Sequence, residues 1–290
     1  MGNCLVTKLN EVVNNSNLKK LGVLRFEVDV TSISDNRNRK NTIHCNINNH
    51  CKFKIVSGPK GGQIIKIGTS EALDVPKGTE FFLDNSLDMY YFSKIGKYVI
   101  EITNKYDITI FNIDHNVSIL LNDMKYLNTL SRVVLQGEKV IGNFNDLLTS
   151  YTTHIKVNNM IADNQYVSAE TVVGDIAKIA NTQMVSFISE YCNGITGNLS
   201  SLSSHSTLST FVINNANKIT GKISDITGIP HLSNFQCIGN KLITGSLADF
   251  LDNGQLRNPE LKMLLVTNTN IVKNQEDITT LRNLGVQVSV

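Results

Sequence analysis

The triplet Ile-Thr-Gly occurs at residues 195–197, 219–221 and 243–245, with a constant spacing of 24 residues. Apolar residues recur in the same register. The aligned sets are Met184, Leu208 and Leu232; Phe187, Phe211 and Phe235; Ile195, Ile219 and Ile243; Leu199, Ile223 and Leu247; and Leu202, Ile226 and Phe250. A fixed period of this length is typical of a solenoid, in which each repeat buries its apolar side by stacking on its neighbours.

Looser copies of the repeat flank the three regular ones. The segment from Leu130 to Gly142 matches upstream, and the segment from Leu261 to Ile271 matches downstream. Terminal repeats are expected to be atypical because they must close an otherwise open core. We therefore assign residues 117–290 to a repeat domain.

Upstream of the repeats the apolar pattern has a period of two. VLRFEVDV at residues 23–30 alternates, and short runs such as YVIEIT and ITIFNI follow between Gly, Pro and Asn clusters. This spacing predicts an antiparallel β-sandwich or barrel over residues 23–116, preceded by an N-terminal arm over residues 1–22. Asparagine, at about one residue in eight, suits such turn-dense structure because it tolerates the left-handed backbone region.

The repeat units resemble leucine-rich repeats, whose pattern is L-x-x-L-x-L-x-x-N/C-x-L. With Leu232 as the first position, Cys237 is sixth and Asn240 is ninth; Cys192 and Ala216 stand at the ninth position of the two preceding repeats. The resemblance implies a parallel strand over the first six positions, and a ninth side chain that bonds the turning backbone. The expected fold class is mainly β (α+β overall), with an N-terminal antiparallel β-sandwich or barrel and a C-terminal leucine-rich-repeat-like solenoid.

The whole chain is also similar to Asn-rich, Ile-Thr-Gly-repeat proteins of Bacteroides-infecting phages, including the crAss-like phages. The LVTKL start at residues 5–9, the small β domain and the repeats carry this resemblance. It implies a non-enzymatic virion protein, such as a capsid- or tail-attached fibre or decoration component, assembled in the host cytoplasm. The alternatives are a bacterial surface module that binds carbohydrate or protein, and a glycan-active enzyme.

The repeat predicts a binding face. Strand side chains alternate, so the fifth position of L-x-x-L-x-L points away from the core. The residues at this position are Val134, Ile188, Val212, Gln236 and Leu265. An apolar stripe on a repeat surface indicates a partner surface, here for other virion proteins, copies of this chain, or a host surface glycan or protein. The alternative is that the N-terminal domain or another subunit covers it.

Several function classes are disfavoured. The net charge is only +2 and is spread along the chain, so neither nucleic acid nor a membrane is an expected partner. No apolar run reaches the length of a membrane helix, and the N-terminus lacks the layout of a secretory signal. The sequence contains no G-x-S-x-G, P-loop, H-E-x-x-H, C-x-x-C or dinucleotide-binding motif. We predict no enzyme activity, no cofactor and no metal.

Two clusters could nevertheless bind metal. HCNINNHC at residues 44–51 contains two His and two Cys, but its alternation predicts a hairpin with a loop at residues 48–50 that separates the histidines from the core-facing thiols. Carboxylates also follow the repeat glycines, at Asp146, Asp225, Asp249 and Asp277. We expect these to lie at the starts of short helices, with a calcium ladder as the alternative.

Overall fold

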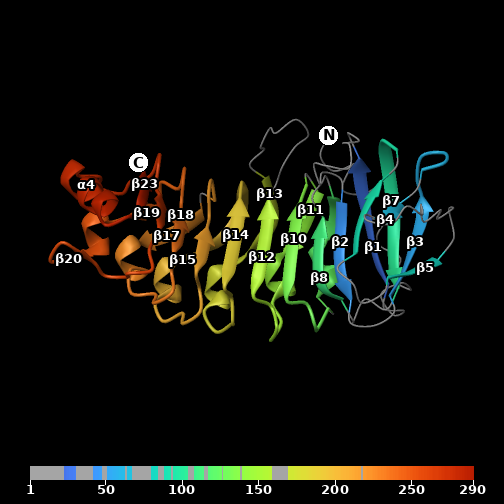
Figure 1. Ribbon diagram of the computed structural model, residues 1–290, viewed down its shortest axis with the longest axis horizontal. Coiled ribbons are helices and arrows are strands. Elements are labelled where there is room, and N and C mark those ends of the chain that lie inside the picture. Colours follow the sequence, from blue (N-terminus) through green and yellow to red (C-terminus); the bar gives the residue numbers. More distant parts are fainter. Residues whose placement is uncertain are drawn as a thin grey trace. The chain divides into compact units, whose positions relative to one another are not determined.

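The chain is mainly β, with parallel strand pairing and few helices. The computed structural model divides it into unit 1 (residues 1–142 and 161–164) and unit 2 (residues 143–160 and 165–290), both labelled by element in Figure 1. The described residues are 23–30, 42–47, 51–62, 64–66, 80–83, 88–92, 94–103, 108–113, 117–125, 127–137, 139–158, 169–216 and 218–290. The predicted arm at residues 1–22 lies outside them.

Unit 1 contains strands in two sheets, with the orders β11-β9-β1-β7-β3-β5 and β10-β8-β2-β6-β4. Strands β1 to β9 pair antiparallel, whereas β10 pairs parallel with β8, and β11 with β9. The bounds are β1 (Leu24–Val30), β2 (Thr42–Ile47), β3 (Cys51–Ser57), β4 (Ile64–Lys66), β5 (Glu80–Leu83), β6 (Asp88–Phe92), β7 (Gly96–Thr103), β8 (Ile108–Ile113), β9 (Val117–Leu120), α3 (Leu121–Met124), β10 (Arg132–Gln136) and β11 (Lys139–Asn143).

The two sheets of unit 1 share a core. The ring of Phe26 on β1 meets the ring of Phe111 on β8 edge-on, with centroids 5.4 Å apart. Residues of β1 are alternately buried and half-buried, which confirms the period of two at residues 24–30. On the half-buried face, the Arg25 guanidinium pairs with the Glu101 carboxylate on β7.

The hairpin predicted around HCNINNHC is wrong. Strands β2 and β3 are consecutive, but β2 pairs with β6 and β8, whereas β3 pairs with β5 and β7 in the other sheet. The alternation found the strands correctly but could not identify their partners, because a period of two fits any neighbouring strand. The His and Cys side chains of this segment lie outside the described residues.

Each regular repeat of unit 2 contributes one strand to each of two sheets, followed by a short 3₁₀ helix. The strand orders within the unit are β23-β22-β18-β16-β14-β12 and β19-β17-β15-β13, and the described pairs are parallel. The bounds are η2 (Phe144–Leu147), β12 (His154–Asn158), β13 (Ala169–Asp175), η4 (Ile176–Ile179), β14 (Ser186–Glu190), β15 (Cys192–Asn198), η5 (Leu199–Leu202), β16 (Thr210–Val212), β17 (Lys218–Lys222), η6 (Ile223–Asp225), β18 (Asn234–Gln236), β19 (Ile243–Thr244), η7 (Leu247–Phe250), β20 (Leu251–Asp252), β21 (Gln255–Leu256), β22 (Met263–Leu265), α4 (Gln275–Asn283) and β23 (Gln287–Ser289).

Pairing between repeats keeps the sequence register. Phe187 is opposite Phe211, which is opposite Phe235, and their rings stack with centroids 5.8 and 6.3 Å apart. The β20–β21 hairpin is inserted before β22, and Leu264 then continues the column opposite Phe235. All the aligned apolar residues named above are at most 2% exposed, so the predicted core columns are confirmed.

The glycine of each triplet lies against the start of the preceding 3₁₀ helix. Gly197, Gly221 and Gly245 have φ values of 126°, 125° and 114°, a region that side chains of L-residues rarely adopt. A Cβ atom on Gly221 would lie 2.9 Å from the Leu199 backbone nitrogen. Both backbone conformation and space therefore require glycine at this position.

The carboxylates that follow the repeat glycines lie at helix starts, as predicted. The Asp225 carboxylate accepts a hydrogen bond from the Lys222 N–H at 3.1 Å, and that of Asp249 accepts one from the Ser246 N–H at 3.0 Å. Asp146 and Asp277 lie in the first turns of η2 and α4. The predicted use of Asn in left-handed turns is also confirmed, by Asn215, Asn253 and Asn268 with φ between 49° and 57°.

Helix α4 closes the C-terminal end of unit 2. Ile278 and Leu281 on the helix are 5% and 0% exposed, and β23 follows as the last strand of its sheet. An edge strand has free backbone groups that can pair with another chain. Here the Arg282 side chain donates a hydrogen bond to the Val288 carbonyl of β23 at 3.0 Å, so one edge acceptor is already occupied.

Replacing Gly221 with Ala should destabilise the protein by about 2–5 kcal/mol, because the new Cβ adds strain at a positive φ and crowds the preceding repeat. Urea denaturation followed by circular dichroism would measure the loss. Gly228→Ala is the matched control, because a Cβ there would have no atom within 4 Å. Equal stability of the two variants would contradict the role of close approach.

Candidate functional site: the outer face of the strand sheet in unit 2

The strands β12, β14, β16, β18 and β22 present alternate residues away from the core of unit 2. The central row of this outer face consists of residues directly opposite one another on neighbouring strands: Lys156, Ile188, Val212, Gln236 and Leu265. The structure thus brings four of the five predicted binding residues side by side. Lys156 was missed because the repeat containing β12 is separated from the next by a longer, irregular segment.

The exposure of this row is uneven. Val212, in the middle, is only 4% exposed, whereas Ile188, Gln236 and Leu265 are half-buried. Neighbouring side chains therefore cover the centre of the row, and Ile188 and Leu265 offer the apolar surface. The fifth predicted residue, Val134, lies on β10 of unit 1, opposite Asn112 of β8, and is also half-buried.

A row of polar side chains runs beside the central row. The Glu190 carboxylate accepts hydrogen bonds from the side-chain amides of Asn158 at 2.9 Å and Asn214 at 3.1 Å. Asn214 in turn accepts the Ile238 N–H at 3.0 Å. Amide donors satisfy the carboxylate, and these hydrogen bonds join four neighbouring repeats. This polar row was not identified from the sequence, because its residues lie just before the turn and are not part of the apolar repeat pattern.

Two of the three ninth-position side chains bond the backbone of a preceding repeat, whereas Ala216 has no polar side chain to do so. The Asn240 amide donates to the Ile213 carbonyl at 2.6 Å, and the Cys192 thiol donates to the Val157 carbonyl at 3.6 Å. Both cysteines described in unit 2 are buried, and burial raises the pKa of the Cys237 thiol far above its usual range despite the nearby Lys273. A thiol held protonated in this way is a poor nucleophile.

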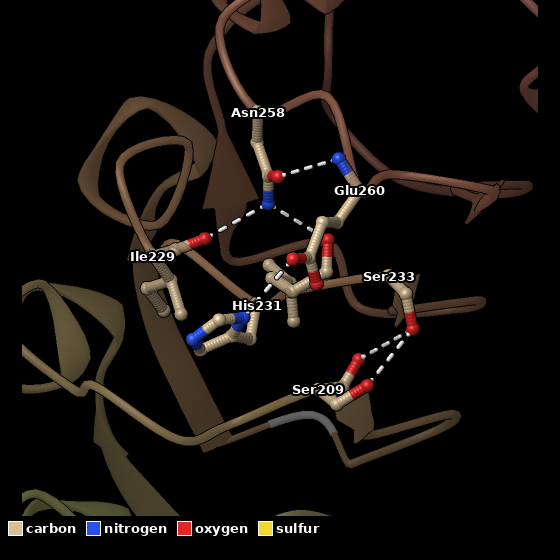
Figure 2. A network of polar contacts seen from close by, with 7 residues as sticks. Ser209, Ile229, His231, Ser233, Asn258 and Glu260 are labelled. Atoms are coloured by element: carbon tan, nitrogen blue, oxygen red, sulfur yellow. Dashed lines mark hydrogen bonds and ion pairs between the residues drawn. The ribbon is translucent and has the colours of Figure 1, made fainter.

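A second polar cluster lies where the chain enters β18 and β22 (Figure 2). The buried Asn258 amide donates to the carbonyls of Ile229 and Leu232, both at 2.8 Å, and its oxygen accepts the Glu260 N–H at 2.9 Å. His231 Nδ1 lies 3.1 Å from Glu260 Oε1 on the exposed side of the cluster. Asn258 therefore fastens the inserted segment to the preceding repeat.

This cluster contains serine, histidine and an acid, but not the geometry of an activated serine. The Ser209 and Ser233 hydroxyls are 2.9 Å apart and bond each other, and Ser233 also donates to the Ser209 carbonyl at 3.2 Å. In Figure 2 the second imidazole nitrogen of His231 points away from both serines. A nucleophile requires a base within hydrogen-bond reach of its hydroxyl. Within the described part of the chain, no three His, Cys, Asp or Glu side chains are grouped to hold a metal ion.

Asn258→Ala should destabilise the protein by about 2–4 kcal/mol, because it removes a donor from the Ile229 and Leu232 carbonyls and leaves the Glu260 N–H without its acceptor. His231→Ala is the control in the same cluster. The His231 side chain is 55% exposed, so its loss should cost no more than about 0.5 kcal/mol. Thermal denaturation of both variants would check this, and an equally mild effect of Asn258→Ala would contradict its fastening role.

No protein-family model, curated protein or solved structure matches the chain. Among the described residues, no helix is long and apolar enough to cross a membrane.

Proposed function

We propose that this protein is a non-enzymatic structural protein of a phage virion, a capsid- or tail-attached fibre or decoration component. In this proposal unit 1 is an antiparallel β-sandwich that anchors the chain, and unit 2 is a leucine-rich-repeat-like solenoid. The outer face of unit 2 contacts copies of the same chain, other virion proteins, or a host surface glycan or protein.

The observation that carries the proposal is the register of the outer face. Ile188, Gln236 and Leu265 lie on a single row across stacked strands, and each is half-buried. Stacked repeats present an extended surface, and such surfaces are used for binding other macromolecules. The similarity of the chain to repeat proteins of Bacteroides-infecting phages supports placing this surface in a virion.

The use of the polar side chains also favours a structural role. Asn240 and Asn258 bond backbone carbonyls of neighbouring repeats, and the Ser209 and Ser233 hydroxyls bond each other. A catalytic site instead holds its acid, base or nucleophile ready for a substrate. These polar groups stabilise the stack.

The double variant Ile188→Glu, Leu265→Glu should prevent assembly, because buried carboxylates without partners cannot be accommodated in an interface. Light scattering on the purified protein would measure self-association. Val212 is left intact, since its burial means that a charge there would impair folding. Thr244→Glu is the control, because Thr244 is exposed on β19 of the other sheet.

Mass spectrometry of purified virions, produced with each variant, tests the remaining contacts. We expect the wild type and Thr244→Glu to be incorporated and the double variant to be absent. Full incorporation of a folded double variant would contradict the proposed face. If the wild type is absent from virions but binds a surface polysaccharide, the protein is a carbohydrate-binding module instead.

A further inference from the structure

A buried histidine lies in the turn between η5 and β16. His205 is only 1% exposed, three residues before the core residue Leu208, and its own N–H donates to the Leu202 carbonyl at 2.9 Å. It belongs neither to the outer face nor to the cluster in Figure 2. Its burial is unusual for a histidine in a Ser-rich turn.

The imidazole acts as a hydrogen-bond acceptor. His205 Nδ1 accepts the N–H of Thr207 at 3.3 Å and the N–H of Leu208 at 3.2 Å. Nδ1 therefore carries no proton, and the neutral ring holds its proton on Nε2. Nε2 is buried and makes no hydrogen bond of normal geometry to any described residue. The Ile179 backbone lies near the ring.

Two other repeats perform the same task with side chains that do not titrate. Three residues before the start of its repeat, Thr149 accepts the Tyr151 N–H at 3.1 Å through its hydroxyl. At the equivalent place, Asn258 accepts the Glu260 N–H at 2.9 Å. In these three turns a side chain accepts the N–H of the residue two positions later, and among the three acceptors only His205 can be converted by acid into a donor.

Few charged groups surround the ring. Helix η5 and the turn that follows it contain none. On η4, Lys178 is exposed, while the Asp175 carboxylate caps the helix by accepting the Ala177 N–H at 2.9 Å. On η6, Asp225 accepts the Lys222 N–H. Among the described residues no carboxylate pairs with the imidazole, so a positive charge there would lack compensation.

We propose that His205 is an acid-sensitive latch, which holds the entry to β16 closed while neutral and opens it when protonated. A proton on Nδ1 would face two N–H donors, so both hydrogen bonds must break and the ring must reach water. Strand β16 pairs with β14 and β18 and carries Val212, so opening this turn loosens the middle of the outer face. In this way the latch would regulate the partner contacts, a consequence that rests on the proposed function.

The direction of the pH dependence follows from the burial. Desolvation lowers the pKa of His205 from its ordinary value of 6.5, and the nearby Ile179 backbone offsets this only in part. The unfolded chain therefore binds a proton before the folded chain does. The contribution of neutral His205 to folding stability is fully present above pH 6.5. It is lost as the pH falls from 6.5 toward the lowered pKa of His205 in the folded state.

Hydrogen exchange of the full chain tests the latch. Protection factors of the Thr207 and Leu208 amides should fall between about pH 7.5 and about pH 5.5, where histidine changes charge. The Glu260 amide, held by Asn258, is the internal reference and should keep its protection. Unchanged protection at Thr207 and Leu208, or an equal loss at all three amides, would overturn the latch.

A variant separates histidine chemistry from general acid destabilisation. In His205→Asn the side-chain oxygen should accept the Thr207 N–H as Asn258 accepts that of Glu260, and the acid-induced loss at Thr207 should disappear. His231→Asn, at an exposed site, should keep the wild-type behaviour. If His205→Asn does not fold, the comparison of wild-type amides still decides. The exchange experiment uses the isolated protein and therefore does not depend on a partner. If the turn opens in acid as expected but the protein binds no partner at neutral pH, only the proposed function is contradicted.

Discussion

The structure of unit 2 depends on the close approach of neighbouring repeats. One repeat has too few apolar residues to form a core, so its phenylalanine and leucine columns are buried only because the next repeat lies in the same register. The approach is close enough that the triplet glycine lies against the helix start of the preceding repeat, with no room for a Cβ. The sequence period of 24 residues and the spacing of stacked strands are thus two expressions of one packing constraint.

Stacking at this distance leaves many backbone groups at the turns without partners in a sheet. Short side chains supply them. Asn240 and Asn258 bond carbonyls of preceding repeats, and Asp225 and Asp249 bond N–H groups at helix starts. This explains a composition rich in Asn, Ser and Thr: the polar side chains complete backbone hydrogen bonding at the edges of the stack.

The periodic features could be predicted from sequence, because they repeat. The core columns, the glycines and the carboxylates at helix starts each recur at the same place, and each proved to have one physical cause. The partners of β2 and β3 could not be predicted, since alternation specifies which face is buried but not which strand is adjacent. The burial of Val212 by neighbouring side chains of the outer face was also not predicted. It depends on the lengths of side chains from several strands, which the alternation of a single strand does not contain. His205 and Asn258 look unrelated in sequence, and only their hydrogen bonds show that they perform the same task.

The hydrogen bond between Arg282 and Val288 makes the edge of the sheet at β23 different from the strands inside the stack. Every internal repeat has backbone groups that the next repeat can use, so the architecture contains no intrinsic limit to its length. At β23 a guanidinium occupies the outward carbonyl where a further strand would have to pair. A further strand could pair at this carbonyl only if the Arg282 hydrogen bond were broken, so a side chain of the same chain already competes with strand addition at this edge.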